Sequence, residues 1–132
     1  MKYLAIDLGL KRIGLAYSAH KDIVTPLPAV IRKNRNQAAS EVKNAIDEWG
    51  VDAVVVGIPL GGSSEEEMGR RIRHFMNLVD FEGKIYFQDE AGSSLEAENS
   101  MKGKIKYIRD GRIDSLSAKI ILERFLATQK QK

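Results

Sequence analysis

The chain has 132 residues, of which 43% are hydrophobic and 30% are charged. A length in the range of about 100–200 residues predicts one domain, large enough to bury about two-thirds of its unfolded surface. The sequence has no cysteine, which excludes disulfide frameworks, thiolate zinc sites and cysteine nucleophiles. His20 and His74 are its only histidines and leave little room for a histidine-rich metal site.

The formal net charge is +3, a surplus too small to identify a nucleic-acid partner by itself. Its distribution is more informative. Arg32, Lys33 and Arg35 form one basic cluster, and a second one consists of Lys102, Lys104, Lys106, Arg109 and Arg112. Each cluster fits either a solvated loop or a phosphate-binding surface.

The N-terminal segment has a short apolar run that Asp7 interrupts. It does not resemble a secretory signal, and no apolar run approaches the ~18 residues of a membrane span. We therefore expect a soluble protein of the cytoplasm without a membrane partner.

The first third of the chain predicts three strands. Lys2–Ile6 and Arg12–Ser18 are short apolar runs joined by a turn, which favours an antiparallel hairpin. Val24–Ile31 contains Pro26 and Pro28, so it is expected at a sheet edge or as an irregular strand.

Two helices with apolar stripes follow in the sequence, one before and one after a buried strand. The strand is Ala53–Gly57, an uninterrupted apolar run. The first helix is predicted to end at Gly50, and its stripe consists of Ala38, Val42, Ala45, Ile46 and Trp49. The second stripe consists of Met68, Ile72, Phe75, Met76 and Val79.

The remaining elements are a strand at Lys84–Gln88, a short helix at Ser94–Met101 and a last helix from Asp114 to about Ala127. The resulting order is three strands followed by alternating helices and strands, with two helices at the end. This order predicts an α/β fold, with a mixed sheet of leading antiparallel strands and βαβ units flanked by helices. Without repeats or linkers, residues 1–132 are expected to form a single domain.

Three carboxylates lie at the ends of predicted elements. Asp7 ends the first strand, Glu90 follows a later strand with Asp89 beside it, and Asp114 begins the last helix. If the two strands are neighbours, these acidic groups meet and need a cation between them. Oxygen ligands of this kind favour Mg²⁺ or Mn²⁺, and paired ions of this type support phosphodiester hydrolysis.

Each acidic position also has a purely structural interpretation. Asp114 is a good helix N-cap, and both Asp7 before Gly9 and Asp89-Glu90 before Gly92 are typical of polar turns. Other catalytic patterns are absent: the sequence has no phosphate-binding loop, nucleophile elbow or dinucleotide fingerprint.

Four segments in order resemble the motifs of the YqgF family, also known as RuvX-type Holliday junction resolvases. The first runs from Ala5 to Ala16, and the second is Val55–Leu60 with Gly61 and Gly62. The third is Asp89-Glu90 with the serines and Glu96 that follow, and the fourth runs from Ile113 to Glu123. Each motif is weak alone, but the ordered set spans nearly the whole chain.

The resemblance implies an RNase H-like fold and a nuclease that matures the 5′ end of 16S rRNA or cuts branched DNA. By resemblance, Asp7, Glu90 and Asp114 are catalytic residues and ligands of Mg²⁺ or Mn²⁺. Asp7 is expected to bridge two ions. Asp89 is expected to assist the site without binding an ion directly.

Substrate contacts are expected from glycines and from basic residues. Gly9, Gly61 and Gly62 let a phosphodiester backbone approach, and the basic cluster Lys102, Lys104, Lys106, Arg109 and Arg112 binds flanking phosphates. The family usually has an arginine after the Asp-Glu pair, where this chain has Ala91. Lys11 or Arg12 could take over its role.

Several alternatives stay open. The substrate is pre-rRNA, which family grounds favour, or branched DNA, for which a homodimer rather than a monomer is expected; Leu60, Phe81 and Tyr107 could contribute to its interface. With Ala91 in place of the arginine, the protein could also bind RNA as a non-cleaving assembly factor. A nucleotide-binding relative of actin and the sugar kinases would need two such domains, which 132 residues cannot supply.

Overall fold

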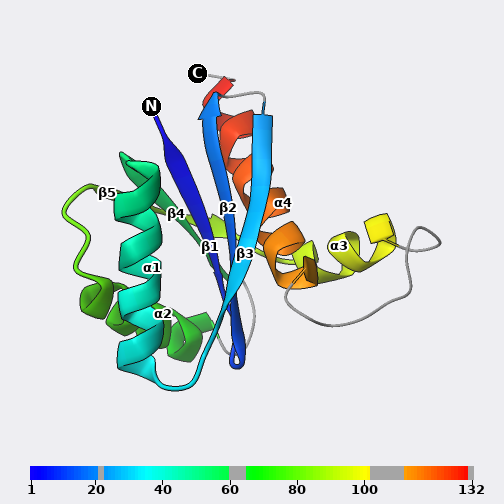
Figure 1. Cartoon of the computed structure of the whole chain (residues 1–132). Coiled ribbons are helices and arrows are strands. Elements are labelled where there is room, and N and C mark those ends of the chain that lie inside the picture. The colour runs from blue at the N-terminus through cyan, green and yellow to red at the C-terminus, as the bar shows by residue number, and fades with distance from the viewer. Residues whose placement is uncertain (21–22, 60–64, 102–111, 131–132) are drawn as a thin grey trace.

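The computed structural model describes residues 1–20, 23–59, 65–101 and 112–130. Figure 1 shows its elements in chain order. They are β1 (Tyr3–Leu8), β2 (Arg12–His20), β3 (Ile23–Ile31), α1 (Arg35–Trp49), β4 (Ala53–Ile58), α2 (Glu65–Val79), β5 (Lys84–Asp89), α3 (Ser93–Met101) and α4 (Arg112–Lys130). Every predicted element is present, and most bounds differ from the prediction by no more than three residues.

The strands form one five-stranded sheet in the order β3-β2-β1-β4-β5. β1 pairs antiparallel with β2, and β2 pairs antiparallel with β3. β1 and β4 are parallel, as are β4 and β5. The predicted mixed sheet is confirmed, but β1, which carries Asp7, and β5, which Glu90 follows, are not neighbours, because β4 lies between them.

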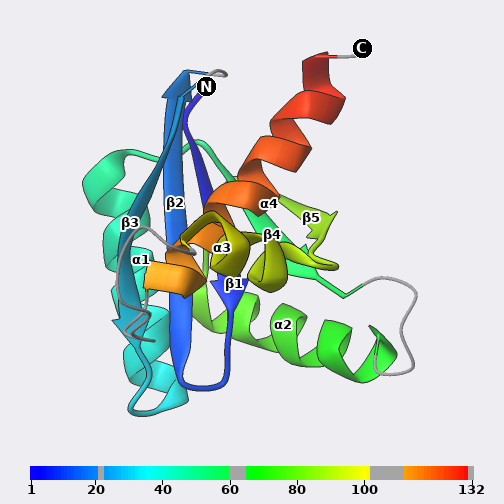
Figure 2. The same cartoon turned by 90° about the vertical axis from the view of Figure 1, so that its right-hand side faces the viewer.

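Helices cover both faces of this sheet. α1 and α2 lie on one face, while α4 crosses the other, with α3 packed beside its first turns (Figures 1 and 2). Residues of β1 alternate between the faces: Leu4 and Ile6 belong to the core under α1 and α2, and Ala5 belongs to the core under α4. Asp7 therefore lies on the α4 face.

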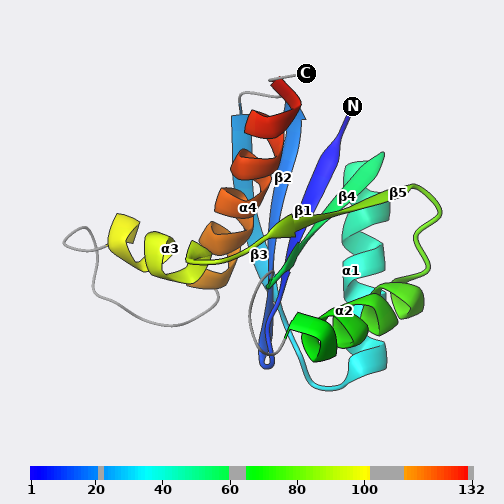
Figure 3. The ribbon, with the colours of Figure 1, turned by 180° about the vertical axis from the view of Figure 1, so that it is seen from behind.

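β4 lies between β1 and β5, and all its residues are buried. Burial of an aliphatic side chain stabilises a fold by about 1.5–3 kcal/mol, so Val54, Val55 and Val56 fix the strand firmly. β3 is an edge strand, as its prolines predict. Viewed from behind, β5 forms the opposite edge (Figure 3).

α1 begins after an Asn34 capping box with Gln37 and ends at Trp49, where Gly50 caps it with a φ of 61°. Its apolar stripe is buried at Ala38, Val42 and Ile46 but not at Trp49. The Trp49 side chain is 40% exposed and lies against Tyr17 of β2, with 4.7 Å between the ring centroids. Within the described ranges, no helix has the length and apolar character needed to cross a bilayer.

Candidate active site

The Asp7 and Glu90 carboxyl groups meet on the α4 face of the sheet, where they share a hydrogen bond. Asp7 is the penultimate residue of β1, and Glu90 directly follows β5. The backbone N–H of Glu90 donates to the Ile58 carbonyl at 3.1 Å, which holds the residue against the end of β4. The pair is therefore formed across the intervening strand.

Gly57 of β4 makes this contact possible. It follows Val56, which pairs with Ile6, and so lies beside Asp7. A Cβ at this position would lie 3.0 Å from Glu90 Oε2 and 2.6 Å from Ile121 Cδ1 of α4. A side chain here would occupy the space in which the two carboxyl groups meet.

The surroundings of Glu90 favour its protonated form. Burial, followed by the negative charge of Asp89, raises the pKa of Glu90 above its usual range, while the hydrogen bond to Asp7 lowers it. Two carboxyl groups share a hydrogen bond only when one of them carries a proton. The pair thus concentrates negative charge that a proton or a cation must offset.

Asp89 stabilises the turn after β5. Its Oδ1 accepts a hydrogen bond from the Ala91 N–H at 3.1 Å, so the polar-turn interpretation holds for this residue. From α4, the Arg124 Nη1 donates to the carbonyls of Asp89 at 3.4 Å and Ala91 at 2.8 Å. Arg124 therefore clamps the backbone on both sides of Glu90.

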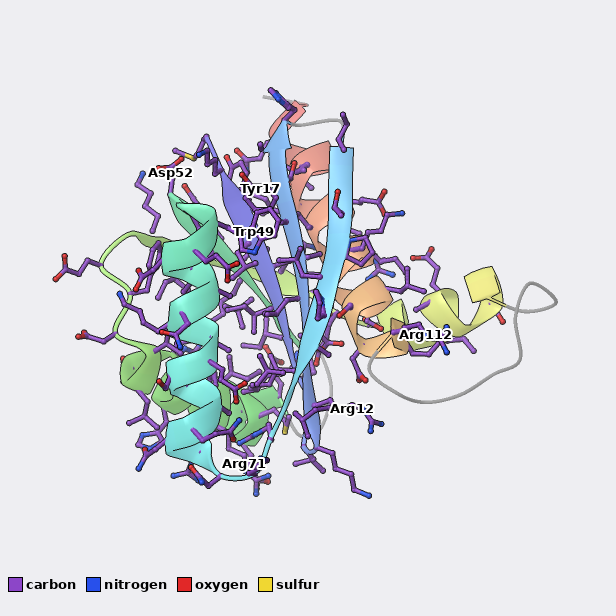
Figure 4. All side chains as sticks on the ribbon, viewed as in Figure 1. Arg12, Tyr17, Trp49, Asp52, Arg71 and Arg112 are labelled. Carbon is purple, nitrogen blue, oxygen red and sulfur yellow. The ribbon has the colours of Figure 1, made fainter. Side chains whose placement is uncertain are left out.

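Asp114 lies in the first turn of α4 and not at its N-cap, because the helix already begins at Arg112. Its Oδ2 accepts a hydrogen bond from Arg12 Nε at 3.0 Å. Arg12 is 22% exposed and Asp114 12%, so water screens this ion pair less than a surface pair. Figure 4 shows Arg12 near the end of the strands that faces the beginning of α4.

Close packing brings the first turn of α4 to the strand beside Asp7. Asp7 pairs with Gly14 across the hairpin, and a Cβ on Gly14 would lie 1.9 Å from the Asp114 carbonyl oxygen. The Ser115 hydroxyl donates to the Leu27 carbonyl at 2.5 Å, which anchors this turn to β3. The three predicted carboxylates thus belong to adjoining segments, with Asp7 bound to Glu90 and Asp114 bound to Arg12.

The donor set fits a hard divalent cation. Asp7 and Glu90 offer carboxylate oxygens at one point, and such ligands suit Mg²⁺ or Mn²⁺. Within the described ranges, no group of three or more acidic or histidine side chains is close enough to form a complete metal site. Of the three predicted ligands, Asp114 is held by Arg12 through its Oδ2.

The other predicted contacts have mixed outcomes. Gly9 lies in the tight turn after β1, where a Cβ would lie 2.4 Å from the Arg12 carbonyl oxygen, so the turn itself requires a glycine. Lys11 is exposed, and Arg112 is exposed at the beginning of α4. The remaining predicted substrate contacts and two of the predicted interface residues lie outside the described ranges: Leu60, Gly61, Gly62, Lys102, Lys104, Lys106, Tyr107 and Arg109.

Sequence reasoning missed the contributions of Gly57 and Arg124. Gly57 lies in the second motif, and the glycine that ends a buried run was a usable signal of close approach. Arg124 gave no such signal, because it lies far along the chain from the turn that it clamps. His20 is exposed at the end of β2, and His74 is also exposed.

The fold matches solved structures of Holliday junction resolvases. A Thermus thermophilus RuvC bound to a Holliday junction substrate has a TM-score of 0.60 at 14% identity, covering 98% of this chain and 96% of its own. A fowlpox virus Holliday junction resolvase has a TM-score of 0.58 at 13% identity, covering 97% of this chain and 99% of its own. These likenesses confirm the RNase H-like architecture.

Sequence comparisons identify the family. Proteins named "Putative pre-16S rRNA nuclease" match nearly the full length. One from Sulfurimonas denitrificans is 75% identical over 126 residues, covering 96% of this chain and 97% of its own. One from a Sulfurovum species is 52% identical over 127 residues, covering 96% and 99%. The family model described as RuvX, Holliday junction resolvase, matches residues 1–128, and the chain belongs to this family.

Proposed function

We propose that this protein is a nuclease that depends on Mg²⁺ or Mn²⁺ and processes the 5′ end of pre-16S rRNA in the cytoplasm. The observation that carries the proposal is the contact between Asp7 and Glu90 across Gly57. The names of the full-length relatives support pre-16S rRNA as the substrate. The protein acts as one domain, as a monomer or a homodimer.

The proposed ligands are Asp7, Glu90 and Asp114. A divalent cation held there would supply positive charge to the scissile phosphate and lower the pKa of a bound water. Asp7 and Glu90 would orient that water through their carboxylate oxygens. Arg124 keeps Glu90 in place through the turn that it clamps.

Arg12 is proposed to have two partners in turn. It holds Asp114 at 3.0 Å in the protein alone. A substrate phosphate would compete for its guanidinium, because arginine binds phosphate and carboxylate oxygens through the same N–H donors. Release of Asp114 would then complete the ligand set. Arg12 thus supplies a positive charge near the site in a chain that has Ala91 after Glu90.

The test is a cleavage assay with purified protein and Mn²⁺ or Mg²⁺. A precursor 16S rRNA 5′ fragment and a four-way DNA junction are offered in parallel. We expect cleavage of the RNA, and we expect Asp7→Asn to lower the rate by about a thousandfold. Asp47→Asn is the matched control, because Asp47 is exposed on α1, on the other face of the sheet.

Each other outcome has a definite meaning. Cleavage of the junction alone would make branched DNA the substrate, in line with the description of the family model. Salt-sensitive RNA binding without cleavage would favour a non-cleaving assembly factor. Undiminished cleavage by Asp7→Asn would refute the site.

A further inference from the structure

A cavity of about 630 Å³ lies at the end of the sheet where β1 turns into β2. Its described lining comes from β1 and the following turn, from the connection between β3 and α1, and from α2. These segments belong to the face that α1 and α2 cover (Figure 1). The volume lies in the range of about 300–1,000 Å³ that is typical of small-ligand sites.

The cavity is strongly basic, and we call it the arginine cavity. Its basic lining residues are Arg32, Arg35, Arg70, Arg71 and His74. Among the described lining residues none is acidic. Guanidinium groups bind phosphate oxygens through pairs of N–H donors, so the lining favours an anionic ligand that carries phosphate.

Arg32 is held in place at the base of the cavity. Its Nη1 donates to the Gly9 carbonyl at 2.7 Å, and its guanidinium lies 5.6 Å from the centroid of the Phe75 ring. These contacts fix one positive charge beside the β1–β2 turn. A guanidinium that is already positioned loses little conformational entropy when it binds an anion.

The arginines of α2 are free to change partners. Arg71 pairs with Glu67 at 2.8 Å, and Arg70 pairs with Glu66 at 3.9 Å. All four side chains are largely exposed, and such pairs one helical turn apart contribute only about 0.3–0.5 kcal/mol. A phosphate group can therefore replace the glutamates at little cost.

The cavity also has an apolar part. Leu8, Met68, Ile72 and Phe75 contribute to its lining. Leu10 lies in the turn after β1 and is 82% exposed, an unusual position for a large aliphatic side chain. Arginines next to an apolar surface suit a nucleotide, whose phosphate is anionic and whose base has an apolar face.

The arginine cavity and the carboxylates lie at the same end of the sheet but on opposite faces. Asp7 and Leu8 are consecutive in β1, so their side chains point to opposite sides. Figure 4 shows Arg12 and Arg71 at this end of the molecule. A nucleic-acid strand that is bound at Asp7 can therefore pass over the β1–β2 turn and reach the cavity.

We propose that the arginine cavity binds a nucleotide of the unpaired strand that flanks the scissile phosphate. Arg35, Arg70 and Arg71 bind its phosphates, and Leu10 contacts its base. The inference rests on the proposed function, because it takes nucleic acid to be the substrate. Binding itself requires neither a metal ion nor cleavage.

The test measures binding of a fluorescent oligouridylate by anisotropy in EDTA, over a range of salt concentrations. The variant is the double substitution Arg70→Gln with Arg71→Gln, and glutamine keeps the helix propensity. We expect affinity to fall about tenfold at low salt. Each phosphate contact on a single strand steepens the negative slope of log K against log salt by about 0.7. Loss of two contacts should therefore make the slope shallower by about 1.4.

The control removes the same charge outside the cavity. Arg73→Gln with Lys84→Gln changes two exposed residues, neither of which lines the arginine cavity. We expect a slope close to that of the wild type. Equal losses in both double variants would indicate a general field of positive charge and would overturn the proposal.

Two further measurements test the contact with the base. Leu10→Ala should lower affinity about threefold without a change in the salt slope, because it removes only apolar contact. Uridine monophosphate should displace the oligouridylate at a lower concentration than inorganic phosphate. Equal displacement by the two, or an unchanged affinity of Leu10→Ala, would overturn the assignment of a nucleotide.

The outcomes separate this inference from the proposed function. Normal cleavage together with unchanged oligouridylate binding by the Arg70 and Arg71 variant would refute the arginine cavity alone. Impaired binding by that variant, together with full cleavage by Asp7→Asn, would refute the catalytic site and leave the cavity standing.

Discussion

Glu90 is the residue whose ionisation the fold opposes most clearly. Its side chain is partly buried, Asp89 precedes it, and the Asp7 carboxyl group contacts it. Burial and like charge both oppose ionisation. An amide at position 90 would avoid this cost, and the proposed role of Glu90 in catalysis gives a reason for the carboxylate.

Glu90→Gln should therefore raise the melting temperature by a few degrees near neutral pH in the absence of divalent ions. The pKa of Glu90 is raised in the folded state, so its contribution to stability is present at low pH and is lost as the pH rises through that raised value. Glutamine has no such loss, and its amide can donate to Asp7.

Thermal unfolding of both proteins as a function of pH checks this expectation. The difference in melting temperature should shrink as the pH falls toward the usual glutamate value of 4.5. A difference that does not change with pH would show that the charge of Glu90 is not its cause.

At the scale of the elements, β4 both separates and connects the carboxylates. It lies between β1 and β5 and has no side chain at Gly57, where Glu90 Oε2 would lie 3.0 Å from a Cβ. α4 then covers this point with Ile121 and clamps the turn after β5 with Arg124. The geometry of the site thus depends on β4 and α4, although these two elements contribute few of its charged groups.

Gly57→Ala should destabilise the protein by about 1–3 kcal/mol, the usual cost of overpacking a core. The added methyl group would lie 2.6 Å from Ile121 Cδ1, so the side chain of Ile121 or of Glu90 must shift. We expect cleavage to fall by about a hundredfold, because small displacements of catalytic groups are costly.

Gly69→Ala is the matched control for this substitution. A Cβ at Gly69 would lie 3.0 Å from the flexible end of Arg73 and 3.5 Å from Ile58 Cδ1. Alanine also favours a helix over glycine by about 1 kcal/mol. Denaturant unfolding and cleavage rates should show equal or greater stability and normal activity for this variant, in contrast to Gly57→Ala.

For the whole molecule, the carboxylates connect parts of the sheet that lie far apart in the sequence. Asp7 lies in the leading hairpin, and Glu90 follows the last strand. A cation bound by both would act as a cross-link between the central strand β1 and the edge strand β5. A ligand that binds only the folded state stabilises the whole fold by mass action.

Mn²⁺ should therefore raise the melting temperature of the wild type. The free energy of unfolding should increase by about 1.4 kcal/mol for each tenfold excess of the ion over its dissociation constant. Removal of the ion with EDTA should reverse the shift. Asp7→Asn should show little shift, whereas Asp47→Asn should respond like the wild type. An equal response of Asp7→Asn would place the ion elsewhere.

The sequence by itself determined the elements and the identity of the acidic residues. Hydrophobic periodicity depends on residues a few positions apart, so it predicted the buried strand β4 and the stripes of α1 and α2. It overestimated burial at Trp49, because a stripe does not reveal how far the neighbouring sheet extends. Asp7 and Glu90 were found from their places at strand ends and from the ordered motifs.

Only the tertiary structure decided which of these groups meet. The order of strands placed β4 between β1 and β5, and the contact of Asp7 with Glu90 then required Gly57 to have no side chain. The pairing of Arg12 with Asp114 and the clamp by Arg124 join residues far apart in the chain. The arginine cavity likewise combines three separate segments. Such contacts follow from how strands and helices pack in space, and local sequence patterns do not encode that packing, because each pattern reports only its own neighbours along the chain.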